Sequence, residues 1–284
     1  MCNTSTTSCS DPSNHSIYLA SSDDGISWNV IPEFAARSGS VPDLVVYQNY
    51  LYLFHTGNSE NWVKLNACLE AVDSGTTTVS GGTDTAGFVD PSLIVAGDEM
   101  TLFYLPGVLG ADPAGCSSYP CNKEIHSATT SGGNPSSFTQ LTGARTQETL
   151  NNGAYSDPDI VALSNGNYLL YVSAGQSTLV YTATDLATAF VSPSAPSQTV
   201  ISNNSGGVPS AIQVASGDVW LYVTTNVAGH EVIRRAVSTD GTSTISDAGF
   251  STVLDASLFG SASDPINVSS PSIISWDDLS SWER

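Results

Sequence analysis

Short apolar runs alternate with polar turns along this chain, and one unit of that pattern recurs. Its clearest copy spans 153–175: polar residues surround Asp157-Pro158-Asp159, an apolar run follows over 160–163, and Ser164-Asn165-Gly166 precedes an aromatic strand over 168–173. This pattern predicts a β-hairpin whose first strand begins in a carboxylate-rich loop.

The same unit occurs four more times, each time with a proline at the start of an apolar run. The prolines are Pro42, Pro91, Pro158, Pro209 and Pro271, so the unit recurs every 49 to 67 residues. Aromatic strands follow the first four prolines, and further runs supply a third strand (124–129, 179–184, 232–239) and a short fourth (139–141, 199–201, 253–254). We therefore expect an all-β fold, a five-bladed β-propeller of four-stranded antiparallel blades, that forms one domain over 1–284.

The two ends of the chain complement each other. Residues 16–30 supply a third and a fourth strand without a first, whereas the unit at Pro271 supplies a first strand with almost no chain after it. We expect the N- and C-terminal segments to pair in one blade that closes the ring, because closure removes open sheet edges. Residues 279–284 are barely long enough for the second strand of that blade.

The octapeptide S-S-D-D-G-I-S-W at 21–28 fits the pattern S-x-D-x-G-x-[ST]-W. It resembles the Asp-box of sialidases and other propellers, for which a structural role is expected. Asp23, the aspartate of the pattern, would cap a tight turn, Gly25 would adopt a positive φ, and Trp28 would pack between blades.

Composition narrows the range of partners. The chain has 7 basic and 27 acidic residues and a formal net charge of −20. Binding to nucleic acid or to an anionic membrane needs Lys and Arg, so neither is expected. No apolar run is long enough for a membrane-spanning helix, and we expect a monomer.

Cysteine spacing and low lysine content favour an exported protein, secreted or held at the cell surface or in the periplasm. The spacings of Cys2 and Cys9 and of Cys116 and Cys121 each permit a disulfide, and Cys68 is expected to be a buried side chain within a strand over 64–69. The N-terminal residues M-C-N-T-S lack the apolar core of a signal peptide, and Cys2 could be a lipid-anchored cysteine after signal removal.

Carboxylates gather around the repeated prolines. In a propeller the first strand of each blade lines the central channel, so these residues are expected to converge on one funnel. They are Asp43, Asp90, Asp157 and Asp159 in the first three units, and Ser210, Ser270 and Ser272 in the last two. The plainer interpretation is that an Asp at a strand start accepts backbone N–H bonds.

Five blades with Asp-Pro at strand starts resemble the five-bladed glycoside hydrolases, above all family 43. The resemblance implies a general base before Pro in the first blade, an orienting Asp before Pro in the third, and a Glu general acid in the fourth. Asp157 matches the third-blade position. Val41 stands at the first, with Asp43 two positions later, and Val208 stands at the fourth. Glu231 or Glu148 would then have to supply the missing acid.

Such hydrolysis needs one protonated and one ionised carboxyl, about 6.5 to 9.5 Å apart for inversion. We expect Asp43, Asp90, Asp157 and Glu231 to be catalytic, because crowded aspartates raise one another's pKa values. A second set is expected to bind substrate: Asp159, Trp62, Arg145, Tyr155 and His230. Arg145 could equally offset acidic neighbours, and the aromatic residues could pack between blades.

The expected function is thus hydrolysis of a polysaccharide or oligosaccharide in a central aspartate-lined pocket. Two alternatives stay open. One is a non-catalytic glycan-binding or adhesion propeller, which the missing fourth-blade glutamate favours. The other is a polysaccharide lyase, for which His126, His230 and Arg145 are the candidates. No cofactor is required, although carboxylates in the channel suit Ca²⁺ or Na⁺.

Overall fold

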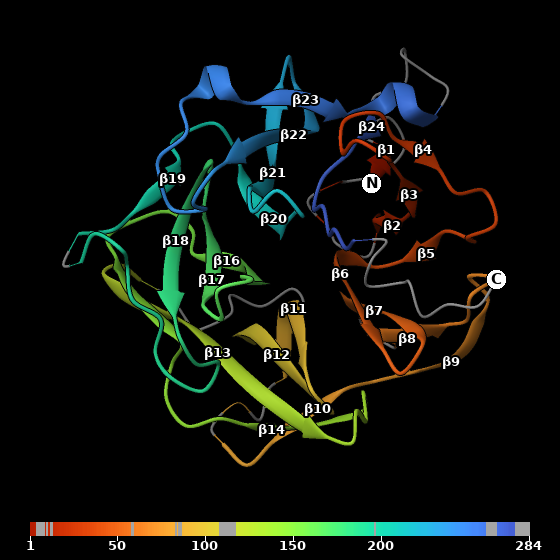
Figure 1. The fold of residues 1–284 in the computed structure, drawn as a ribbon, viewed down its shortest axis with the longest axis horizontal. Coiled ribbons are helices and arrows are strands. Elements are labelled where there is room, and N and C mark those ends of the chain that lie inside the picture. Colours follow the sequence, from red (N-terminus) through yellow and green to blue (C-terminus); the bar gives the residue numbers. More distant parts are fainter. Residues whose placement is uncertain are drawn as a thin grey trace.

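Radial β-sheets surround a central axis in the computed structural model of this chain (Figure 1). The structure describes residues 1–284 except 4–8, 10, 12–13, 58–59, 83, 85–86, 108–117, 196, 260–265 and 276–284. The helical segments with given bounds are two short 3₁₀ turns, η3 (Asp247–Gly249) and η4 (Ala256–Phe259). The fold is an all-β propeller, as the repeated strand pattern predicts. None of the helices in the described ranges is long and apolar enough to cross a membrane.

Four blades are complete, and each begins with a proline-led strand on the axis. Blade 1 consists of β6 (Ser40–Tyr47), β7 (Tyr50–Thr56), β8 (Trp62–Leu65) and β9 (Ala71–Gly75). Blade 2 consists of β11 (Phe88–Ala96), β12 (Glu99–Pro106), β13 (Cys121–Ser131) and β14 (Ser137–Gln140), with β10 (Thr78–Ser80) beside β14 and β15 (Thr146–Leu150) beside β13. Blade 3 consists of β16 (Ser156–Ala162), β17 (Tyr168–Ala174), β18 (Ser177–Ala183) and β19 (Val200–Ser202). Blade 4 consists of β20 (Gly207–Gln213), β21 (Val219–Val227), β22 (His230–Ser238) and β23 (Ser251–Leu254).

The expected fifth four-stranded blade was wrong for the part of the chain that the structure describes. The terminal segments form three two-stranded ladders instead: β1 (Cys2–Asn3) with β24 (Ile266–Asn267), β2 (Ser16–Ile17) with β5 (Arg37–Ser38), and β3 (Ala20–Ser21) with β4 (Asn29–Val30). The two ends do meet, in β1 and β24. Residues 268–275 around Pro271 are not a strand and have no ladder partner among the described residues; serine hydroxyls join them to blades 4 and 1. The expected strand at 279–284 lies outside the described residues.

One hydrogen bond joins each proline-led segment to the next around the axis. The acceptor is always a side-chain oxygen of the residue directly after one proline. The donor is the backbone N–H of the residue two positions after the next proline around the axis. The bonds run from Leu93 N to Asp43 Oδ2 (2.6 Å), Ile160 N to Ser92 Oγ (3.1 Å), Ala211 N to Asp159 Oδ2 (2.8 Å), Ile273 N to Ser210 Oγ (3.1 Å) and Leu44 N to Ser272 Oγ (2.9 Å). We call these five bonds the axial ring. It is closed, so the segment around Pro271 acts as the fifth member, although its described residues belong to no blade.

Two equivalent turns dock the outer strands onto the preceding blade. In the turn after β22, Asp240 Oδ1 accepts the N–H groups of Thr242 and Ser243, each at 2.8 Å, and Tyr171 of blade 3 donates to Gly241 O. Gly241 adopts a φ of +70°.

The turn after β3 has the same form. Asp24 accepts the N–H groups of Ile26 and Ser27, and Tyr222 of blade 4 donates to Gly25 O, where φ is +68°. The capping residue is therefore Asp24 and not Asp23, because Asp24 is the aspartate that lies directly before the left-handed glycine. Trp28 meets Tyr222 edge to face, with ring centroids 6.0 Å apart.

Cys2 and Cys9 form the disulfide that their spacing permits. Cys68 is free and exposed, so its expected burial was wrong: β8 ends at Leu65, and Cys68 lies in the following turn, where its N–H bonds to Asn66. Cys116 lies outside the described residues.

The docked turns give a test of this arrangement. A Cβ at Gly241 would lie 2.4 Å from Leu169 Cδ1, whereas one at Gly166, with φ +83°, would meet nothing within 4 Å. Both alanine variants carry the cost of a positive φ, about 1 kcal/mol, and Gly241→Ala adds an overpacking cost of about 1–3 kcal/mol. Urea unfolding should therefore show a clearly larger loss of stability for Gly241→Ala than for Gly166→Ala. Equal losses would contradict the docking of this turn on blade 3.

Candidate functional site

The residue before each repeated proline has a left-handed backbone. The φ angles are +47° at Val41, +54° at Asp90, +49° at Asp157, +46° at Val208 and +55° at Ser270. In the four blades the ladder register shifts at this point, which is a β-bulge. A non-glycine residue there costs on the order of 1–3 kcal/mol. Bulges re-aim side chains next to functional sites, and here they occur at the start of each axial strand.

Asp90 and Asp157 form a pair at this end of the axis. Both side chains are half-buried. Burial is the largest cause that raises the pKa of each, and the charge of Asp157 raises the pKa of Asp90 further. The backbone of Asp157 and the charge of the Lys123 ammonium both act to lower the pKa of Asp90. Ser156 donates to Asp157 Oδ2 at 2.5 Å. The two carboxyls therefore titrate as a unit and retain a proton at higher pH than ordinary aspartates.

Asp43 and Asp159 belong to the axial ring and not to that pair. Their side chains are buried, and each accepts a backbone N–H from the next repeat. Ser272 also donates to Asp43 Oδ1 at 3.0 Å. Burial raises the pKa of Asp43 to about 7, and burial together with the charge of Asp43 raises the pKa of Asp159 well above its usual range. Both line a central channel of about 720 Å³ whose other walls are residues that follow the prolines.

The prediction that all these aspartates converge on one funnel was therefore wrong. Asp90 and Asp157 precede their prolines, whereas Asp43 and Asp159 follow theirs and serve as hydrogen-bond acceptors in the ring. The carboxylates form two tiers along the axis. The largest cavity does not contain the pair either: it measures about 750 Å³ and lies between the terminal segments and blades 1 and 4, lined by residues such as Ser22, Leu51 and Trp220.

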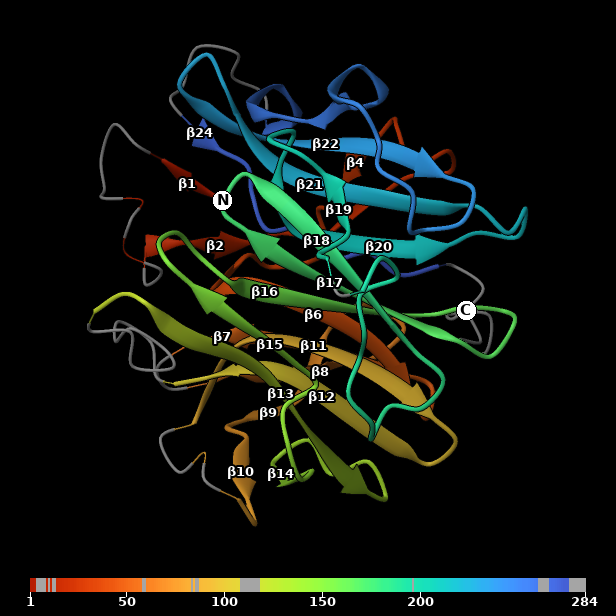
Figure 2. The same ribbon diagram turned by 90° about the vertical axis from the view of Figure 1, so that its left-hand side faces the viewer.

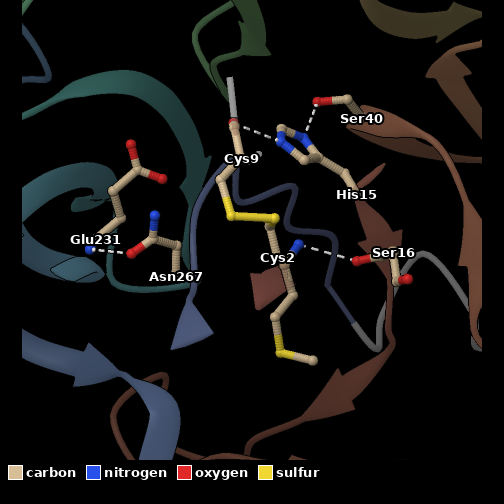
Figure 3. The surroundings of a disulfide bond; sticks show 8 residues. Cys2, Cys9, His15, Ser16, Ser40, Glu231 and Asn267 are labelled. Atoms are coloured by element: carbon tan, nitrogen blue, oxygen red, sulfur yellow. Dashed lines mark hydrogen bonds between the residues drawn. A yellow bond between two sulfur atoms is a disulfide. The ribbon is translucent and has the colours of Figure 1, made fainter. Parts of the chain in front are cut away.

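Glu231 lies in blade 4, beside the terminal segments. Its N–H donates to Asn267 Oδ1 at 3.0 Å and its carbonyl accepts the Val268 N–H. Figure 3 shows it next to Asn267, in the surroundings of the Cys2–Cys9 disulfide. Figure 2 shows β1 and β2 toward the end of the disc at which β6 and β20 begin. Glu231 is thus at the same end of the axis as Asp90 but two blades away from it.

Three residues expected to contact substrate are buried instead. Trp62 is 4% exposed and packs in the core between blades 1 and 2. Tyr155 is 1% exposed and donates to Thr146 Oγ1 at 2.6 Å. Arg145 is also 1% exposed and donates to three backbone carbonyls, those of Thr142, Gly143 and Ala187. Their burial contradicts the expected contact with substrate, because Trp62 and Tyr155 pack between blades and Arg145 is held by backbone carbonyls.

The two remaining histidine candidates differ in their surroundings. His230 is exposed at the start of β22. His126 is buried between two carboxylates, with Nδ1 2.6 Å from Asp84 Oδ2 and Nε2 2.8 Å from Glu124 Oε2. Both of its ring nitrogens are occupied, so His126 has no free nitrogen with which to act as a lyase base.

Lys123 acts on the Asp90–Asp157 pair but was not among the candidates predicted from the sequence. It is buried, it lies on β13, and its charge acts on Asp90. Its rarity could have identified it, since Lys64 and Lys123 are the only lysines in the sequence. Within the described residues, no group of three or more His, Cys, Asp or Glu side chains is arranged to hold a metal ion.

No protein-family model matches this chain, and no curated protein sequence matches it. Solved structures share its fold at low sequence identity. An endo-arabinase from Bacteroides thetaiotaomicron gives a TM-score of 0.55 at 14% identity over 76% of this chain and 80% of that one. A family 43 endo-arabinanase from Bacillus licheniformis gives 0.55 at 16% identity over 75% and 76%. An arabinanase from Bacillus subtilis gives 0.55 at 14% identity over 84% and 81%. This chain thus has the propeller fold of those glycoside hydrolase structures.

The buried carboxyls predict an unusual dependence of stability on pH. Asp43, Asp90, Asp157 and Asp159 all have raised pKa values in the folded state, so their stabilising effect is present below pH 3.8 and is lost as pH rises toward 7. The pKa values of Asp24 and Asp240 are lowered, and their contribution is lost below 3.8. Two groups oppose the first trend against these four: burial lowers the pKa of His55, whose contribution is lost below pH 6.5, and lowers the pKa of the Met1 ammonium to about 6, so that its contribution is lost as pH falls below 8.

Calorimetry should therefore find the highest Tm at about pH 4–5, with a decline toward pH 7. Asp43→Asn, which keeps an acceptor for the Leu93 N–H and cannot ionise, should reduce that decline. A Tm that rises steadily from pH 4 to pH 7 would contradict the assignment of these pKa shifts.

Proposed function

We propose that this protein is an exported glycoside hydrolase that cleaves a polysaccharide or oligosaccharide at the Asp90–Asp157 pair. One observation carries the proposal: two carboxyls from neighbouring blades lie together at the strand-start end of the axis, and both have raised pKa values. Perturbed carboxyl pairs are typical of catalytic sites. The likeness of the fold to arabinanase structures supports the choice of carbohydrate as substrate.

The pair has the chemistry that glycoside hydrolysis requires. With one proton between them, the protonated carboxyl gives its proton to the leaving glycosidic oxygen as the C–O bond breaks. The ionised carboxylate bonds to the anomeric carbon as that bond breaks, and water then hydrolyses this intermediate while the first carboxyl takes the proton of the water, which is the route for carboxyls only about 5 Å apart. One proton is lost and one is gained, so the pair ends each turnover with a single proton again.

The site departs from the pattern that the family 43 resemblance implies. Val41 and Val208 occupy the pre-proline positions of blades 1 and 4, where the resemblance places the base and the acid. In this proposal the chemistry moves to blades 2 and 3, and Asp157 keeps its position but shares the reaction with Asp90.

The same two valines favour a second candidate, a non-catalytic glycan-binding propeller. Binding does not require an acid and a base, so apolar residues at these positions would carry no penalty. Fold alone does not choose between the two.

An assay of reducing-sugar release on arabinan, galactan, xylan and algal polysaccharides tests the proposal. Asp90→Asn and Asp157→Asn should each lower the rate by about 10²–10⁴-fold, the range expected for loss of an acid or base. Asp98→Asn is the matched control, because Asp98 is exposed in the turn between β11 and β12, at the other end of the strand that carries Asp90, and it should keep full activity.

The outcomes separate the candidates. Wild-type protein that binds a polysaccharide but releases no sugar would establish the binding module. Full activity in both asparagine variants would place the reaction elsewhere. An unsaturated product would indicate a lyase.

A further inference from the structure

The two carboxyls of the pair occupy equivalent places in neighbouring repeats, but different residues precede them. Val89 comes before Asp90, and Ser156 comes before Asp157. Both preceding residues belong to the ladder between the first and second strands of their blade, so their backbones are fixed. One carboxyl therefore follows an apolar side chain and the other follows a hydroxyl.

The Ser156 hydroxyl holds one oxygen of the Asp157 carboxyl. It donates to Asp157 Oδ2 at 2.5 Å. A hydrogen-bond donor stabilises the ionised form of a carboxyl, and this contact acts to lower the pKa of Asp157 against the effect of burial. Because the bond engages Oδ2, Oδ1 is the oxygen left to react with a substrate atom.

Asp90 is anchored through its backbone instead. Its N–H donates to Thr56 Oγ1 of blade 1 at 2.9 Å. The preceding Val89 is 5% exposed, packs in the core between blades 2 and 3, and has no hydroxyl to donate. Within the described part of the chain, no side chain donates a hydrogen bond to the Asp90 carboxyl. Its protonated form is therefore favoured over that of Asp157.

The charged groups that act on the pair come from three strands. They are Asp90 on β11, Lys123 on β13 and Asp157 on β16. The Lys123 charge acts to lower the pKa of Asp90, but burial is the largest cause and the charge of Asp157 adds to it, so that this pKa lies well above its usual range. A single proton shared by the pair therefore resides on Asp90.

We propose that Asp157 is the nucleophile of the pair, that Asp90 is its acid and base, and that Ser156 is a positioning residue that holds Asp157 for the attack. This inference rests on the proposed function of the pair and assigns its two roles. Asp157 Oδ1 bonds to the anomeric carbon as the glycosidic C–O bond breaks, and Asp90 gives its proton to the leaving oxygen. Water then displaces Asp157 from that carbon and returns a proton to Asp90, so the sugar keeps its anomeric configuration.

Carboxyl ¹³C NMR of the free wild-type protein tests the assignment without a substrate. When the pair holds one proton, Asp90 should show the shift of a carboxylic acid and Asp157 that of a carboxylate, with Asp90→Asn and Asp157→Asn used to assign the two signals. The reverse distribution of the proton would overturn the inference.

Two variants of Ser156 test its role. Ser156→Ala removes the donor and should raise the Asp157 midpoint by about one pH unit, which lowers kcat by about 10-fold with KM little changed. Ser156→Thr keeps a hydroxyl and should restore both values. An Asp157 midpoint that does not move in Ser156→Ala, or an equal loss of kcat in the two variants, would show that Ser156 has no positioning role.

Azide separates the roles of the two aspartates. Both positions have left-handed backbones, with φ of +54° and +49°, so Asp90→Gly and Asp157→Gly remove the carboxyls without backbone strain. The substrate is a dinitrophenyl glycoside of the sugar that the wild type releases, because this leaving group needs no acid. With sodium azide, Asp90→Gly should give a glycosyl azide of retained configuration, since azide replaces water in the second step. Asp157→Gly should give the opposite anomer, since azide replaces the nucleophile.

The outcomes keep the two proposals apart. The opposite pairing of variants and azide products would overturn the assignment of roles while sugar release by the wild type still supports the proposed function. Absence of sugar release together with the expected ¹³C shifts would count against the proposed function and leave the difference between the two carboxyls established.

Discussion

The structure depends on the satisfaction of five backbone N–H groups around its axis. Each lies just inside a proline-led segment, and a buried N–H without an acceptor costs about 1–3 kcal/mol. The residue after the preceding proline supplies the acceptor at every step: Asp43, Ser92, Asp159, Ser210 and Ser272. The closed axial ring therefore sets five segments around the axis, and four of them continue into full blades within the part of the chain that the structure describes.

This constraint divides the acidic residues by role. An aspartate directly after a proline belongs to the axial ring. Its carboxylate accepts a backbone N–H, and its burial raises its pKa. An aspartate before a proline lies outside the ring, on a left-handed backbone, with its carboxylate free for other contacts. Asp90 and Asp157 are the pre-proline positions with carboxylates, and they occupy adjacent repeats. The carboxyls that meet are those of neighbouring blades.

Much of the fold could be predicted from the sequence, because proline-led apolar runs and aromatic return strands recur with visible spacing. The arrangement of the terminal segments could not, since the pattern at Pro271 shows that a segment reaches the axis but not that the described terminal residues pair as two-stranded ladders. Asp90 and Asp157 were identified as candidates, but their separation from Asp43 depends on the one-residue bulge at each proline, which no periodicity reveals. The burial of Arg145 also escaped prediction, because its acceptors are carbonyls of irregular backbone.

The central claim is that the Asp90–Asp157 pair, and not the channel beyond the axial ring, is where substrate reacts. A crystal structure of Asp157→Asn with a bound oligosaccharide, chosen from the polymer that the wild type degrades, tests it most directly. The account predicts an anomeric carbon next to the side chain at position 157, with Asp90 within hydrogen-bond distance of the glycosidic oxygen of the same sugar. An oligosaccharide seated in the channel past Asp43 and Asp159, or at the terminal ladders with both pre-proline positions free of sugar, would contradict it.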